Sequence, residues 1–280
     1  MPSTPILTDA ELKDLSQDCK WLHTCASRIS EEDSIILNLQ KEQFCFLEST
    51  FVIIGPSDIG QFLRREILNV ALIHVYMSAA YEELNSCEPP IKIGWFCPES
   101  ISDTKCVNDP DDIRAYIETS LTNFLASKHT FILASYVEDL HWILLVICPL
   151  TNIVHVFDSL QKSQSPPCNT KFKALLDAYY ITFATRFSTM KKVRGQMGSI
   201  SRATFPKWTE LKCFQQPSNS VDCVYYTLKY MDDIIKSVKE VGVNIDVVLY
   251  DIPRETRPLR NGEMRELKDK IAAYLANFCP

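Results

Sequence analysis

The chain has 280 residues, and its content of 46% hydrophobic and 23% charged residues is ordinary for a globular protein, which excludes a disordered or fibrous chain. Acidic residues outnumber basic ones to give a net charge of −6, so the positive excess that backbone-driven nucleic-acid binding requires is absent. The longest apolar runs, such as 142–148, fall far short of the roughly 18 residues of a membrane-spanning helix. We therefore expect a globular protein with neither a specific nucleic-acid partner nor a membrane partner.

The cysteines and histidines indicate a reducing environment and no metal. There are 11 cysteines without a C-x-x-C pair, and the N-terminus lacks the apolar segment of a signal peptide. We expect an intracellular protein of the nucleus or cytoplasm, and the basic run at 191–194 is a weak candidate for a nuclear-import signal. The five histidines are scattered and no phosphate-binding glycine loop occurs, so neither a metal site nor a cofactor is expected.

The sequence predicts one domain with a loosely attached N-terminal segment. Only seven glycines occur, and no linker, repeat or low-complexity tract marks an internal boundary. Residues 1–40 mix charge with short apolar groups and predict an N-terminal extension of one or two helices packed on the rim. Residues 41–280 then form the main domain.

The first elements of the main domain follow from turn and cap signals. Residues Phe44 to Ile54 predict a strand closed by Gly55-Pro56, with Ser57 as the cap of a following helix. The stretch 58–84 is apolar on several sides and free of proline, which indicates one long buried helix or a pair of them. Another helix opens at Asp109-Pro110, because proline suits the first helical position.

The second half alternates strands and helices. Apolar segments at 131–137, 141–148 and 153–157 predict three strands of one sheet. The remaining expected elements are a helix at 171–187, a loop at 188–204, a strand at 208–214, a helix from about 223 and a last helix around 264–275. Helices and strands intermixed around a modest sheet predict an α+β fold.

Two of these strands can be paired from the order of their residues. If Pro149 to Asn152 is a four-residue hairpin loop, Cys148 lies opposite Ile153. Side chains alternate along a strand, so the same register makes His141 and Asp158 diagonal neighbours on one face, about 7–8 Å apart at the backbone. Asp158 could therefore orient the imidazole. The same alternation places His155 on the opposite face of the sheet, so we expect it to be a structural histidine.

A nucleophile near such a His and Asp pair would make the three residues a catalytic set. Cys223 is the candidate, since it opens a helix, where free amides and the helix dipole favour a thiolate. Just upstream, Gln215 and Gln216 could each place a side-chain amide near it as an oxyanion-hole donor. Each feature alone occurs commonly in proteins without a site. Their order and spacing are what favour a catalytic interpretation.

With these residues assembled, the sequence resembles the ubiquitin-like-protein proteases, cysteine peptidases that mature and remove SUMO-type modifiers. The resemblance is carried by HWILLVICPLTNIVHVFDSL from His141 and by QQPSNSVDCVYYTLKYMDDII from Gln215, and it extends more weakly over about 45–278. It is closest to the plant and transposon-associated branch of that family.

The resemblance implies a papain-like α+β fold with a mostly antiparallel central sheet flanked by helices. It implies Cys223 as nucleophile, His141 as general base, Asp158 as the residue that orients it, and Gln216 as oxyanion donor with Gln215 as alternative. Residues 41–280 would be the catalytic-type domain. The family grips a tail ending in two glycines in an aromatic tunnel, so the resemblance also implies substrate binding by Trp142 and by Ile67, which stands where the family has a tryptophan.

Two hypotheses for function follow. In the first, the protein is a cysteine-type peptidase or isopeptidase that cleaves after the C-terminal glycine of a SUMO-type, ubiquitin-like modifier. In the second, it is a protease-derived module that binds such a modifier or another partner but has weak or no turnover, because Val224 replaces the glycine that usually follows the nucleophile. If the bulk of Val224 is the only defect, Val224→Gly raises activity.

Overall fold

The computed structural model describes residues 6–29, 34–46, 48, 50–66, 69–127, 129–160, 170–190 and 205–279, with the backbone alone at 125 and 183–190. The predicted substrate-binding residue Ile67 and the basic run 191–194 lie outside the described residues.

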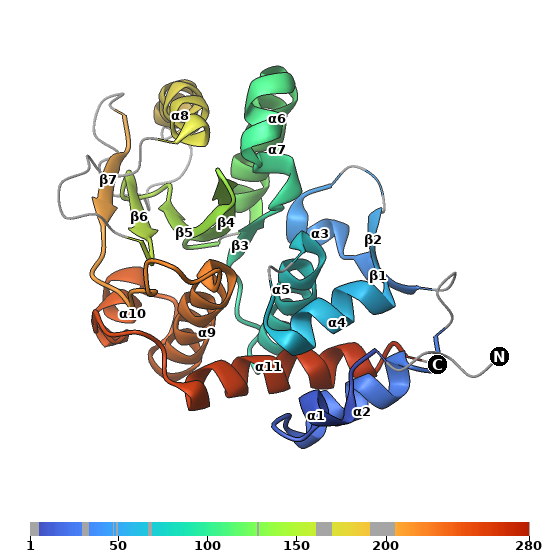
Figure 1. Cartoon of the computed structure of the whole chain (residues 1–280). Coiled ribbons are helices and arrows are strands. Elements are labelled where there is room, and N and C mark those ends of the chain that lie inside the picture. The colour runs from blue at the N-terminus through green and yellow to red at the C-terminus, as the bar shows by residue number, and fades with distance from the viewer. Residues whose placement is uncertain are drawn as a thin grey trace.

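A five-stranded sheet in the order β3-β4-β5-β6-β7 is the centre of the fold (Figure 1). Its strands are β3 (Gly94–Phe96), β4 (Ile132–Glu138), β5 (His141–Cys148), β6 (Ile153–Phe157) and β7 (Lys207–Glu210). The two central pairings are antiparallel, whereas β3 and β7 pair in parallel at the two edges. The three strands predicted in succession are thus confirmed as the middle of the sheet.

The hairpin between β5 and β6 has the register that the sequence predicts. Cys148 pairs with Ile153 across the Pro149–Asn152 loop, and Asn152 adopts a positive φ of 60° there. Between β4 and β5 the chain reverses through Asp139 and Leu140, which both have positive φ, as a two-residue type I′ turn requires. This tight turn places His141 at the first position of β5, at one end of the sheet.

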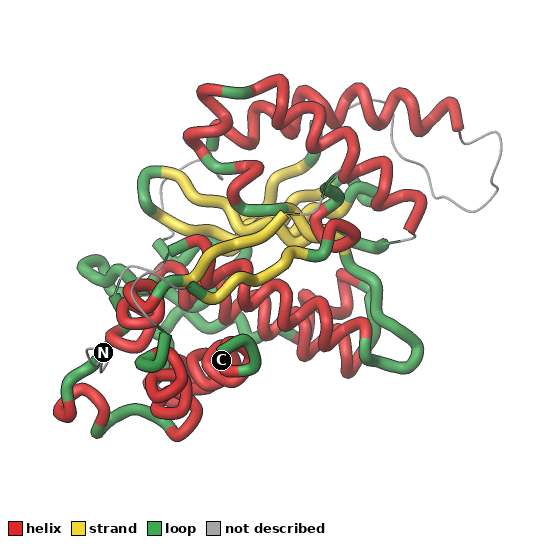
Figure 2. Tube along the Cα trace, turned by 90° about the vertical axis from the view of Figure 1, so that its right-hand side faces the viewer, coloured by secondary structure: helices red, strands yellow, loops and turns green. Residues whose placement is uncertain are grey.

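Helices cover both faces of the sheet, as Figure 2 shows. Because β5 is buried along nearly its whole length, its alternate residues enter two separate hydrophobic clusters. One cluster contains residues of α5 (Val70–Asn85), α9 (Cys223–Val241), α10 (Ile245–Asp251) and α11 (Asn261–Ala276). The other contains residues of the 3-10 helix η1 (Glu99–Ile101) and of α6 (Asp103–Asn108), α7 (Pro110–Ser127) and α8 (Lys171–Met190).

The N-terminal third differs most from the sequence expectations. Two helices, α1 (Asp9–Leu12) and α2 (Gln17–Ala26), are confirmed, but β1 (Ile35–Leu39) was not expected and pairs antiparallel with β2 (Thr50–Ile54). Leu22 of α2 is buried in the same cluster as α5 and α9. This segment therefore packs on the main core, and the division of the chain at residue 40 stays a prediction.

Four of the predicted boundaries were wrong. Phe44 belongs to the short helix α3 (Lys41–Phe44), because its fully buried ring packs on His74 and Cys45 ends the helix at positive φ. The N-cap of α4 (Pro56–Arg64) is Gly55, with the Asp58 carboxylate accepting its amide, and not Ser57.

The predicted strand 208–214 ends at Glu210. Beyond it the chain runs beside the end of β6, where Leu211 N donates to Val156 O. The helix predicted at 171–187 continues to Met190, and the rest of the predicted loop 188–204 lies outside the described residues.

Within the part of the chain that the structure describes, no helix combines the length and apolar character needed to span a membrane.

Candidate active site

His141 and Asp158, the pair predicted from the hairpin register, are joined in the structure. His141 Nε2 lies 2.7 Å from Asp158 Oδ1. The same carboxylate oxygen accepts the backbone amide of Leu160 at 2.8 Å, so Asp158 is held by its own turn while it binds the ring. Because Nε2 faces Asp158, the other ring nitrogen is the one left for a nucleophile.

Cys223 is that neighbour of the imidazole. It is the first residue of α9, follows the N-cap Asp222, and is 6% exposed. Its Sγ lies 3.8 Å from the carbonyl oxygen of Leu140, the residue just before His141. The structure therefore brings together the three residues that the sequence singled out, from β5, from the end of β6 and from the start of α9.

The charges around His141 favour its protonated form. Burial alone would lower its pKa, but hydrogen bonds to Asp158 and Cys223 and the negative charge of both groups outweigh burial and raise the pKa to about 9. At pH 7 an imidazolium then lies beside Cys223 at the N-terminus of a helix. That environment stabilises thiolates in proteins.

Most other cysteines lack such surroundings. Burial is the main cause that raises the pKa of seven of them: Cys19, Cys45, Cys97, Cys106, Cys148, Cys213 and Cys279. A thiol that stays protonated is a poor nucleophile. Cys213 is close to the site, since its Sγ lies 3.4 Å from Asp158 O, yet its pKa rises to about 11.

The two candidate oxyanion donors differ in how their amides are engaged. Gln215 Nε2 lies within hydrogen-bond distance of three backbone oxygens, those of Asp158, Cys213 and Phe214. Gln216 Oε1 accepts the Ser159 hydroxyl at 2.7 Å, and its Nε2 donates to Ser220 O at 3.1 Å. An amide group has two N–H donors. Among the described residues, Ser220 O is the one acceptor bonded to Gln216 Nε2, so its second N–H can donate to a ligand. The other end of the side chain is already fixed.

Arg65 is a residue of the site that sequence reasoning missed. Its guanidinium binds the Asp222 carboxylate with two hydrogen bonds of 2.8 Å, although the two residues are 157 positions apart. Burial alone would raise the pKa of Asp222, but the bonds from Arg65 and Ser220 outweigh it and lower the pKa. This pair anchors the residue that immediately precedes Cys223. Arg65 follows α4 at a positive φ of 61°. No local sequence signal marks its pairing with Asp222, because the two segments meet only in the folded chain.

Two further residues discussed from the sequence are buried. Trp142 is 8% exposed and lies opposite Val137 of β4 in the sheet. Its side chain belongs to the hydrophobic cluster that also contains residues of α9. Val224 is 2% exposed and belongs to the same cluster. Its side chain contributes to the packing of α9 on the sheet.

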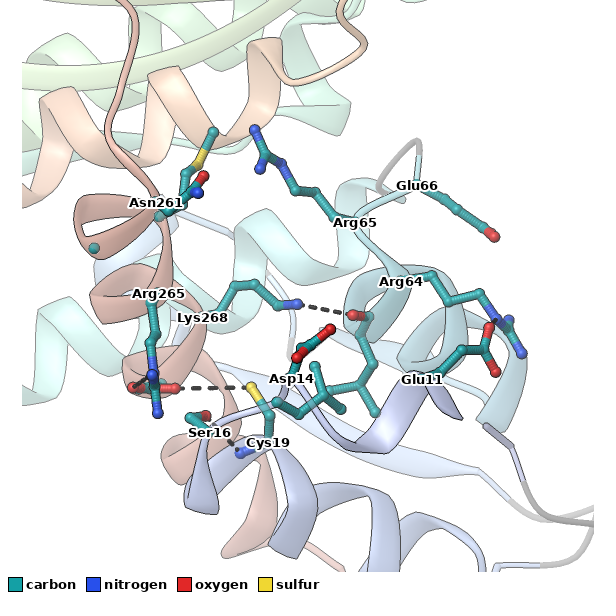
Figure 3. Close-up of a pocket in the computed structure, with 15 residues that line it drawn as sticks. Glu11, Asp14, Ser16, Cys19, Arg64, Arg65, Glu66, Asn261, Arg265 and Lys268 are labelled. Atoms are coloured by element: carbon teal, nitrogen blue, oxygen red, sulfur yellow. Dashed lines mark hydrogen bonds and ion pairs between the residues drawn. The ribbon is translucent and has the colours of Figure 1, made fainter. Parts of the chain in front are cut away.

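A separate cavity of about 810 Å³ lies between α2, the end of α4 and α11. Figure 3 shows its charged lining, which includes Arg65 and Lys268. None of His141, Asp158 and Cys223 lines this cavity. Arg65 lines this cavity and binds Asp222, the residue before Cys223, so the cavity adjoins the candidate active site but is not part of it.

Comparisons with known proteins identify the family and the fold. A family model described as the C-terminal catalytic domain of the Ulp1 protease family matches residues 98–277. The chain belongs to the Ulp1 protease family. The matched segment contains His141, Asp158 and Cys223. The protein therefore has a cysteine protease domain of this family.

Solved structures of Ulp1 proteases share the fold. The catalytic domain of an Ulp1-like SUMO protease from Chaetomium thermophilum matches with a TM-score of 0.56 and 16% identity, over 99% of this chain and 93% of that chain. The Ulp1 protease domain in complex with Smt3, the yeast ortholog of SUMO, matches with a TM-score of 0.52 and 16% identity, over 94% and 95%. SUMO protease Ulp1 with its catalytic cysteine oxidised to a sulfenic acid matches with a TM-score of 0.53 and 15% identity, over 99% and 98%. A search of curated proteins gave no match.

Proposed function

We propose that this Ulp1-family chain is a cysteine-type peptidase or isopeptidase that cleaves after the C-terminal glycine of a SUMO-type, ubiquitin-like modifier. The observation that carries the proposal is the 2.7 Å bond between His141 and Asp158, with Cys223 on the other side of the same ring. Three elements of the fold converge on this one imidazole, in the arrangement that activates a thiol nucleophile.

In the proposed reaction, Cys223 attacks the glycyl carbonyl as a thiolate and forms a tetrahedral intermediate. The free N–H of Gln216 and the backbone amide of Cys223 donate to the new oxyanion. The His141 imidazolium gives its proton to the leaving amine, which departs and leaves a thioester on Cys223. His141 then takes a proton from water, which attacks the thioester and releases the modifier with a free carboxylate.

Asp158 and Arg65 position the reacting groups in this scheme. Asp158 holds Nε2, which keeps the ring turned toward Cys223 and stabilises its positive charge. Arg65 restrains Asp222 and through it the first turn of α9. Both act through neighbouring residues, without contact to the reacting carbonyl.

Substrate recognition is proposed from family membership and from the match to an Ulp1 domain in complex with Smt3. Trp142 and Ile67 are the proposed walls of the channel for the modifier tail, and residues 41–280 the proposed catalytic-type domain. The nuclear or cytoplasmic location and the plant and transposon-associated branch stay predictions.

The alternative, a modifier-binding module without turnover, depends on Val224. The burial of this side chain in the core supports an active site whose mouth it does not occupy. Cleavage of a SUMO precursor and of a lysine-linked SUMO conjugate, by the wild-type chain and by Cys223→Ala, separates the two hypotheses. The peptidase hypothesis predicts cleavage by the wild type alone. Binding of SUMO by both chains with no cleavage would overturn it and favour the module.

A further inference from the structure

A buried histidine, a buried cysteine and a glutamate meet away from the proposed catalytic residues. His74 lies in α5, Cys97 follows β3, and Glu99 begins η1. One donor atom from each lies within 4.8 Å of the other two. The contact between His74 and Cys97 brings together residues that lie 23 positions apart in the sequence.

The two inner donors are buried, and the histidine is incompletely hydrogen-bonded by the protein. His74 is fully buried and Cys97 is 2% exposed, and His74 Nε2 lies 3.9 Å from Cys97 Sγ. Among the described residues, none hydrogen-bonds to His74 Nδ1, and the ring stands edge-on to Phe44 at 5.4 Å. A fully buried imidazole in apolar surroundings is uncharged, and the neutral ring is the form that binds metals.

The segment that carries Cys97 and Glu99 is held rigidly against the sheet and the helices. The backbone amide of Cys97 donates to the Tyr116 hydroxyl at 2.8 Å, and that hydroxyl donates to Phe44 O at 2.9 Å. Ser100 N donates to Cys97 O at 3.1 Å, which closes the turn leading into η1. The outermost donor, Glu99, is exposed and opens the cluster to solvent.

We propose that His74, Cys97 and Glu99 form a binding site for a zinc ion. One nitrogen, one sulfur and one oxygen donor suit Zn²⁺, which accepts all three types in tetrahedral sites. Tetrahedral ligation with ordinary Zn–S and Zn–N bonds places sulfur and nitrogen about 3.6 Å apart, close to the 3.9 Å observed. The sequence predicts no metal site, because no His and Cys residues lie at the short spacing of common zinc motifs. His74 and Cys97 meet only in the folded chain, so their spacing in the sequence could not predict this site.

Charge balance also favours a dication. On binding, the Cys97 thiol releases its proton to solvent and ligates as a thiolate, Glu99 ligates as a carboxylate, and His74 stays neutral. The two negative charges then neutralise Zn²⁺, so the complex can lie in a buried setting without excess charge. With three protein ligands, a water molecule is the expected fourth ligand of the zinc ion. The site shares no residue with the proposed triad and ties α5 to the segment after β3.

The test uses the purified full-length chain carrying Cys223→Ala, because this change removes the triad thiol as a competing zinc ligand. After chelation and desalting, zinc alone is titrated in competition with a chromogenic chelator. We expect one equivalent to bind. Cys97→Ser and Glu99→Gln should each weaken zinc binding by at least roughly tenfold. Loss of a residue that only hydrogen-bonds to a ligand already costs roughly tenfold in affinity, and loss of a ligand should cost no less. Cys106→Ser removes another buried thiol, nine positions further along the chain, and should leave the affinity unchanged.

A second readout identifies the sulfur ligand and does not depend on affinity. Cobalt(II) bound to the Cys223→Ala chain should show a thiolate-to-metal charge-transfer band that disappears with Cys97→Ser and persists with Cys106→Ser. Glu99 is exposed, so Glu99→Gln folds even if the buried variant does not. Absence of zinc binding by the folded chain would overturn the proposal. Binding that survives both Cys97→Ser and Glu99→Gln would overturn it as well.

Discussion

Replacing Asp158 by asparagine tests the electrostatics of the site most sharply. The hydrogen bond to Asp158 heads the contacts that raise the pKa of His141 from 6.5 to about 9. Asparagine keeps the shape and an acceptor oxygen but removes the negative charge. The pKa of His141 should therefore fall by at least one unit, which corresponds to about 1.4 kcal/mol less stabilisation of the imidazolium.

The consequence is a shifted pH profile in addition to a slower enzyme. In the proposed mechanism the protonated ring donates to the leaving amine, so kcat/KM of the wild type declines as pH rises through about 9. In Asp158→Asn the decline begins at lower pH. If the pKa of His141 falls by one to two units, the ratio of wild-type to variant kcat/KM grows roughly three- to twentyfold between pH 6.5 and pH 8.5. This comes on top of an overall loss of roughly 10²–10⁴ from impaired general acid-base catalysis.

The assay is hydrolysis of a fluorogenic amide at the C-terminal glycine of SUMO, measured from pH 5.5 to 10. Asp139→Asn is the matched control, because it makes the same chemical change two residues from His141, in an exposed turn whose positive φ asparagine tolerates. The control should retain the wild-type profile. If Asp158→Asn is folded and its alkaline limb stays near that of the wild type, the assigned role of Asp158 is wrong.

Three further changes probe the rest of the site. Arg65→Gln frees Asp222 and should lower kcat by about ten- to hundredfold through misplacement of Cys223. The control Arg64→Gln loses an ion pair with Glu11 and should leave kcat unchanged. Equal kcat values for the two variants in stopped-flow assays would refute the role of Arg65. Gln216→Ala should lower kcat by roughly 10²–10³ and Gln215→Ala by less, and the reverse order would make Gln215 the oxyanion donor. Val224→Gly deletes a buried side chain and adds a glycine to α9, so urea unfolding should show a loss of about 2–4 kcal/mol. Unchanged stability together with faster turnover would instead confirm steric obstruction of the site by Val224.

The sequence predicts the geometry of the candidate site well where that geometry is local. The hairpin loop at Pro149–Asn152 sets the register of β5 and β6, and period-two alternation then places His141 beside Asp158. The start of α9 at Cys223 follows in the same way from the spacing of apolar residues along a helix. In both cases the information lies within about 20 residues.

Contacts between distant segments could not be predicted in this way. Arg65 meets Asp222 only because α4 and the loop before α9 converge in space, and nothing near Arg65 in the sequence signals the pairing. The donors at His74 and Cys97 likewise come together through the packing of α5 against the region of β3. Phe44 reads as part of a strand from its neighbours, yet burial of its ring against His74 places it in a helix. In each case tertiary packing decides the outcome.

The central claim is that Cys223 is an activated nucleophile for a ubiquitin-like modifier, and one measurement tests it directly. The purified chain and its Cys223→Ala variant are incubated with SUMO and with ubiquitin, each carrying a thiol-reactive warhead at its C-terminus, and intact mass is recorded. The account predicts one covalent adduct with the SUMO probe on the wild-type chain and none on the variant. A folded wild-type chain that forms no adduct with either probe, or an adduct that persists in Cys223→Ala, would contradict it.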